Sequence, residues 1–118
     1  MKLPAEAYLL RIFIGESDKS GGRPLYEVIV EAARGRGMAG ATVVRGVLGY
    51  GANSRIHTAK ILRLSEDLPL VVEIVDKPER IEDFLPELDA MIQEGLVTLE
   101  KVRVITYRHG KNNGKAAT

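Results

Sequence analysis

The sequence has no cysteine, few aromatic residues and no excess of either charge. Without cysteine, disulfides, thiol nucleophiles and cysteine-ligated metal sites are excluded, which fits a reducing cytosol. No apolar run approaches the ~18 residues of a membrane helix, and the start of the chain lacks the apolar stretch of a secretory signal. We therefore expect a cytoplasmic protein without direct membrane insertion. Seventeen basic and sixteen acidic residues leave a net charge of +1, so any recognition of a polyanion must be local.

The chain is long enough for one domain. Its 118 residues are 45% hydrophobic and 28% charged, which is ordinary for a soluble globular protein. We expect a single domain over residues 1–107. Residues 108–118 have little apolar content and predict a disordered tail.

The first half of the chain predicts a strand, a helix and a second strand. Alternating side chains favour a strand over Ala5–Ile14, and a turn-rich loop follows over Gly15–Arg23. A helix should begin at Pro24, where a missing N–H costs nothing, and end at Gly35 or Gly37. Its apolar stripe has helical spacing: Leu25, Val28, Ile29, Ala32 and Ala33. The second strand is expected over residues 41–48.

The second half predicts the same order of elements. An apolar run favours a central strand over Pro69–Val75. Asp76 and Glu79 match a capping box at the start of a helix, which Pro86 should kink or interrupt. Alternation over Leu96–Tyr107 predicts a long fourth strand. Between the halves, residues 54–64 fit an extended loop or a short helix equally well.

The order βαββαβ predicts an α+β, ferredoxin-like fold with both helices on one face of an antiparallel sheet. Right-handed crossovers place the first and third strands at the centre. The uncovered sheet face should carry Leu9, Arg11, Phe13, Val71 and Glu73, or the alternate residues of the same strands if the register differs by one. Either set is too apolar to stay in water, so we expect a homo-oligomer that buries this face. Arg11 should then find a carboxylate or a ligand.

Glycines and cationic residues gather between Gly40 and Lys60. Glycine allows a ligand to approach bare backbone N–H groups, and arginine, histidine and lysine supply donors for a phosphate. The candidate nucleotide-binding residues are Thr42, Arg45, Gly46, Gly49, Tyr50, Gly51, His57 and, from the last strand, Arg103. An ordinary hairpin with bulge glycines and solvated charges explains the same pattern.

The motifs GATVVRGVLGYG, SRIHTA, LSEDLPLVVEIVD and EGLVTLEKVRV resemble, in this order, the PII-like signalling superfamily, and within it a branch of domains of unknown function. The resemblance covers Ala5 to Tyr107. It implies a homotrimer that binds adenine nucleotides in clefts between subunits. It also implies a loop after the second strand, here residues 52–67, that changes shape with the ligand and signals to a protein or transporter.

The resemblance also assigns roles to single residues. The Gly-Met-Thr-Val of PII proteins is similar to residues 40–43, and their Gly-Phe-Gly to residues 49–51. This implies contact of Thr42 with the adenine and of backbone at Gly49 and Gly51 with the nucleotide. The Gly-Asp-Gly-Lys turn that grips phosphates is missing, and only Arg103 or Arg108 matches the paired arginines. AMP or ADP is therefore expected in preference to ATP.

Several candidates keep two interpretations. His57 fits a phosphate contact or a surface histidine, and Tyr50 fits stacking on a base or packing on the sheet. Arg45 fits a subunit cleft or an edge strand. Lys101 and Arg103 share one strand face and fit an anion site or cross-strand pairing with an acid such as Glu73. His57 and His109 lie too far apart in sequence to indicate a metal site.

Two other classes of function receive less support from the sequence. A small enzyme acting on a phosphorylated or acyl-phosphate substrate is the alternative, but no nucleophile lies beside a base and no catalytic residues are assigned. RNA binding would use exposed aromatics on the sheet, and an aromatic content of 5% gives it little support. A non-catalytic sensor is therefore expected, with no required cofactor beyond the adenine nucleotide as ligand and no nucleic-acid partner.

Overall fold

The computed structural model describes residues 6–50, 56–58 and 68–108. The elements are β1 (Glu6–Gly15), β2 (Lys19–Ser20), β3 (Arg23–Pro24), α1 (Leu25–Gly35), β4 (Ala41–Arg45), β5 (Leu48–Tyr50), β6 (Ile56–Thr58), β7 (Pro69–Asp76), α2 (Pro78–Met91) and β8 (Leu96–Arg103). Four long strands form an antiparallel sheet in the order β4-β7-β1-β8. The predicted ferredoxin-like topology, with the first and third long strands central, is confirmed.

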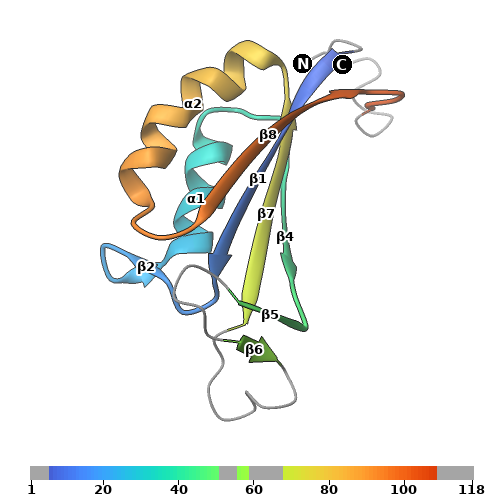
Figure 1. Ribbon diagram of the computed structural model, residues 1–118. Coiled ribbons are helices and arrows are strands. Elements are labelled where there is room, and N and C mark those ends of the chain that lie inside the picture. The colour runs from blue at the N-terminus through green and yellow to red at the C-terminus, as the bar shows by residue number, and fades with distance from the viewer. Residues whose placement is uncertain (1–5, 51–55, 59–67, 109–118) are drawn as a thin grey trace.

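Both helices cover one face of this sheet (Figure 1). The core lies between the helices and the sheet, because alternate residues of the two central strands point toward the helices. Leu10 and Ile12 of β1 and Val72 and Ile74 of β7 are fully buried there, against Phe84 of α2. The predicted stripe of α1 supplies Leu25, Ile29 and Ala33 as its buried residues.

The start of each helix differs from prediction, and one expected interruption is absent. Pro24 ends β3 and precedes α1, which begins one residue later at Leu25. The expected capping box at α2 is wrong, because Lys77 is the N-cap and no side chain caps the helix. Pro86 does not interrupt α2, which is helical from Pro78 to Met91.

Strand predictions failed mainly at their ends. The second strand stops at Arg45, and residues 48–50 form β5, which pairs with β6 instead of the main sheet. The last strand stops at Arg103 rather than Tyr107. The loop expected over residues 15–23 contains the short β2–β3 pair. The strand β6 shows that residues 56–58 are extended, while the rest of the 52–67 loop, Gly51, and the tail beyond Arg108 lie outside the described residues.

Candidate functional site

A groove lies where β4 begins, on the sheet face that the helices leave open. It has a volume of about 430 Å³. One wall is the approach to β4 and its first residues, the floor is formed by β1 and β7, and the other wall is the chain after β8. Its lining residues are Leu9, Ala39, Gly40, Ala41, Thr42, Glu73, Val75, Val104, Thr106 and Tyr107. Thr42, predicted to contact a base, therefore lines this groove.

The second wall exists because the chain turns away from β8 at Val104. Beyond Arg103 the chain runs across the sheet toward the β4 side, away from the helices (Figure 1). The Tyr107 hydroxyl donates a long hydrogen bond of 3.4 Å to the carbonyl of Ala39. Residues 104–107, whose alternation predicts a continuation of the strand, thus form a strap over the open face.

The first wall is held from beneath by a buried carboxylate. Asp76, at the end of β7, is fully buried, and its Oδ2 accepts a hydrogen bond of 2.8 Å from the Ala39 N–H. Its Oδ1 accepts one of 2.7 Å from the Lys77 N–H. Both acceptors are therefore satisfied by backbone, as a buried polar group requires.

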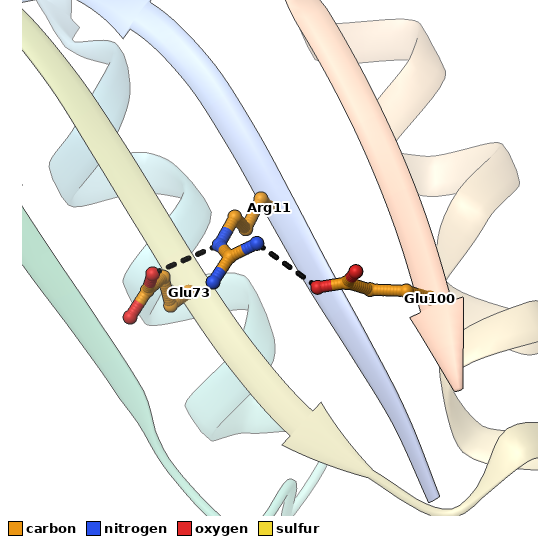
Figure 2. Close-up of polar contacts among 3 residues, drawn as sticks. All are labelled: Arg11, Glu73 and Glu100. Atoms are coloured by element: carbon orange, nitrogen blue, oxygen red, sulfur yellow. Dashed lines mark hydrogen bonds and ion pairs between the residues drawn. The ribbon is translucent and has the colours of Figure 1, made fainter. Parts of the chain in front are cut away.

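Beside the groove, one arginine is shared by two glutamates (Figure 2). Arg11 Nε donates to Glu73 Oε2 and Arg11 Nη1 donates to Glu100 Oε1, both at 3.0 Å. Hydrogen bonding to Glu73 raises the pKa of Arg11, opposed by desolvation and helped by the charge of Glu100. The expectation that Arg11 finds a carboxylate is confirmed. One positive and two negative charges leave this cluster at about −1.

The charge of the groove restricts what it can hold. Among the described residues that line it, Glu73 carries the one formal charge, and neither lysine nor arginine is present. Hydroxyls of Thr42 and Thr106 and the backbone of residues 39–41 offer hydrogen bonds between apolar surfaces. Such a surface suits a flat, uncharged ring better than a phosphate, which needs cationic donors.

The predicted cationic residues lie elsewhere in the same chain. Thr42 pairs with Glu73 and therefore lies on the open face of the sheet. Arg45 pairs with Leu70, and Arg103 pairs with Glu6. By the alternation of the strands, these two positions lie on the face that the helices cover. Arg45 forms an ion pair with Glu16. Arg103 is exposed on the opposite edge strand. Glu73 is not the cross-strand neighbour of Arg103, because β1 lies between their strands, and the acid that lies opposite Arg103 is Glu6.

The predicted glycines lie at the other end of β4. The Gly46 N–H donates to the Pro69 carbonyl at 2.7 Å, and a Cβ at Gly46 or Gly49 would stand 3.0 or 3.2 Å from the Pro69 ring. Close packing of backbone on a proline is one clear reason for glycine here. In β5 and β6, Gly49 pairs with His57 and Tyr50 pairs with Ile56. The structure describes only the backbone of Tyr50 and His57, so the predicted roles of their side chains stay predictions.

Other kinds of site receive no support from the part of the chain described. No group of three or more histidine, aspartate or glutamate side chains there could hold a metal ion. Neither α1 nor α2 has the length and apolar character needed to cross a bilayer.

Sequence reasoning found Thr42 but missed most of the groove. Asp76 is an acid directly after an apolar strand, a pattern that predicts a helix cap and does not indicate the bond to Ala39. Val104, Thr106 and Tyr107 continue the alternation of β8, so nothing in the pattern marks the point where the chain leaves the sheet.

Known proteins resemble this chain in sequence and in structure. The model of the DUF190 family, described as "Uncharacterized ACR", matches residues 7–104. A UPF0166 protein of Aquifex aeolicus is 45% identical over 97 residues, which cover 82% of this chain and 91% of that protein. A UPF0166 protein of Methanocaldococcus jannaschii is 36% identical over 100 residues, 84% of this chain and 92% of that protein.

Among solved structures, the fold is similar to that of CPII, a nitrogen regulatory PII-like protein from Thiomonas intermedia K12. One CPII structure, bound to ADP, AMP and bicarbonate, has a TM-score of 0.58 and 18% identity over 84% of this chain and 88% of that chain. Another, bound to ADP and bicarbonate, has a TM-score of 0.54 and 19% identity over the same shares. At this identity the likeness establishes a PII-like fold. With the family match over residues 7–104 and two curated relatives above 30% identity, the chain belongs to the DUF190/UPF0166 family.

Proposed function

We propose that this chain is a cytoplasmic, non-catalytic regulator that binds an adenine nucleotide, AMP or ADP in preference to ATP. The domain of residues 1–107 would assemble as a homotrimer, hold the nucleotide at seams between subunits, and signal to a protein or transporter through residues 52–67. The observation that carries the proposal is the groove at the start of β4, where Thr42 and the backbone of residues 39–41 meet the strap after β8. The CPII fold, solved with ADP and AMP, supports the same ligand class.

The groove supplies the base-binding half of such a site. Its apolar walls suit a purine, and hydroxyl and backbone groups suit the ring nitrogens and the exocyclic amine. Glu73 lies at one side, so the negatively charged phosphates should point away from it. A site complete with phosphate therefore needs cations from outside the groove.

Those cations are available if copies of the chain assemble. The open face carries half-buried Leu9, Phe13 and Val71 together with exposed Val44 and Leu96. Apolar surface of this kind marks an interface. Packing of copies through it would bring another subunit's basic residues, among them Arg45 and Arg103, near a groove that lacks its own.

Calorimetric titration with AMP, ADP, ATP and cyclic AMP tests the proposal. We expect saturable heat with AMP and ADP, and a loss of about tenfold in AMP affinity for Thr42→Val, which removes one hydroxyl at nearly constant shape. Thr98→Val is the matched control, because Thr98 lies in the same row of the sheet on the opposite edge strand and outside the groove. No heat with any of the four nucleotides at millimolar concentration would refute the proposal.

A further inference from the structure

A buried carboxylate is costly unless its oxygens accept hydrogen bonds, and Asp76 is fully buried with no ion pair among the described residues. It is fully buried and accepts backbone N–H groups from two different segments, Ala39 before β4 and Lys77 before α2. The helix does not use it as an N-cap, because Lys77 occupies that position. Its longer-range bond, 37 residues back along the chain, is the one to Ala39.

Ala39 belongs to the groove wall and is held from two sides. Its N–H is bound by Asp76 from inside the molecule at 2.8 Å, and its carbonyl accepts from the Tyr107 hydroxyl of the strap at 3.4 Å. The peptide groups on both sides of this residue are therefore oriented before any ligand enters. Such orientation lowers the entropy lost on binding.

The turn before Ala39 is fixed to α2 as well. One guanidinium nitrogen of Arg80 donates to the carbonyls of Arg36 and Gly37, at 3.1 and 2.9 Å. Arg36 Nε donates to Glu87 at 2.7 Å. Gly37 has a φ of 72°, in the left-handed region that favours glycine, so the turn has little freedom to relax.

We propose that Asp76 is the positioning residue of the groove: its bond to Ala39 sets the backbone of residues 39–41 and, through it, the place of the Thr42 hydroxyl. This inference rests on the proposed nucleotide site and assigns it a residue that does not touch the ligand. Loss of the bond frees the Ala39 peptide while leaving the lining residues unchanged in identity. Ligand affinity should therefore fall more than the loss of stability explains.

The first experiment uses the unmodified protein without ligand. Amide hydrogen exchange followed by NMR should show Ala39 as slow as amides of the central strands, although it lies outside every strand. In Asp76→Asn, which offers one carbonyl oxygen in place of two carboxylate oxygens, exchange at Ala39 should rise by at least about tenfold. Fast exchange of Ala39 in the unmodified protein would overturn the inference even if the variant failed to fold.

The second experiment separates positioning from general stability. AMP titration of Asp76→Asn should show an affinity about tenfold or more below that of the unmodified protein. Ile81→Val is the matched control, because Ile81 is fully buried in the first turn of α2 and absent from the groove. Equal losses of affinity in the two variants, at temperatures where both are folded, would overturn the inference. If the unmodified protein bound no AMP, the proposed function would fail, while exchange at Ala39 would still decide whether Asp76 holds the wall.

Discussion

The two faces of the main sheet differ in what covers them, although the same strands supply both. On the helix side, Leu10, Ile12, Val72 and Ile74 have no exposed surface. On the open side, their neighbours Phe13 and Val71 are half-buried, and the centre is occupied by the Arg11 cluster with its two glutamates. The helix side is complete within one chain, whereas the open side combines apolar residues with a partly exposed ion cluster.

This difference separates the face that folds the chain from the face on which the proposed site lies. The helix face supplies the apolar core that makes a domain of this size stable. The open face, the groove at its edge and the strap that crosses it add little to that core. We expect substitutions on the two faces to differ both in size and in their dependence on protein concentration.

The largest effect should come from the helix face. Ile12→Ala removes a fully buried side chain and should lower the free energy of unfolding by about 2–5 kcal/mol. Because the contacts lie within one chain, the loss should not depend on protein concentration. Urea denaturation at two concentrations measures it, with Phe13→Ala as the adjacent control, whose effect should vary with concentration because it acts through assembly. Equal, concentration-independent losses would remove the distinction between the faces.

A smaller effect on folding but a large one on assembly is expected from Phe13→Asp. A charge at this half-buried position should keep the subunit folded and prevent copies from packing through the open face. Light scattering should then change from three times the chain mass of 12.9 kDa to a single chain mass, with circular dichroism unchanged. Ala90→Asp, exposed on α2, should remain a trimer. A trimeric Phe13→Asp protein would contradict the proposed interface.

The smallest effect concerns an ion pair between β3 and α1, which belongs to neither face of the main sheet. Arg23 donates to both carboxylate oxygens of Glu31 at 2.9 and 2.7 Å, and this hydrogen bonding lowers the pKa of Glu31. A lowered pKa stabilises the fold above the ordinary value for glutamate, and that contribution disappears as the pH falls through the lowered value. Since both side chains of this ion pair are exposed, its contribution to stability should be small.

An NMR titration of the Glu31 carboxyl measures this pair directly. In Arg23→Gln, the pKa of Glu31 should rise toward its ordinary value, because the main cause of the shift is removed. Arg34→Gln, in the last turn of α1, should leave the pKa of Glu31 unchanged. An unchanged value in Arg23→Gln would show that the ion pair does not form in solution.

The fold was predictable because its two periodicities are strong. Alternation in β1 and β7 and the helical stripe of α1 each bury one face, and chain order with right-handed crossovers fixes the strand order. Arg11 was predictable in a weaker sense. A charge in a central strand requires a partner, but the pattern could not say that Glu100 as well as Glu73 would provide it.

The groove was only partly predictable because its walls depend on contacts between distant segments. Asp76 could serve the nearby helix or the distant Ala39, and local spacing favoured the helix. The strap after Arg103 keeps a strand-like pattern where it has left the sheet. Local sequence does not show which partner Asp76 binds or where the chain leaves the sheet, since the alternatives differ only in tertiary position. The roles of Gly46, Gly49, Gly51 and His57 in binding a nucleotide stay predictions.

The shared arginine has a consequence for how the edge strand finds its place. β8 carries apolar side chains at both parities, Leu96 on one side and Val97 and Leu99 on the other, all exposed, so burial alone discriminates poorly between its alignment and one displaced by a single residue. Such a displacement would turn Glu100 toward the helices and leave Arg11 with one acid. In the folded sheet, the bonds of Arg11 therefore favour the observed pairing of β8 with β1 over the displaced one.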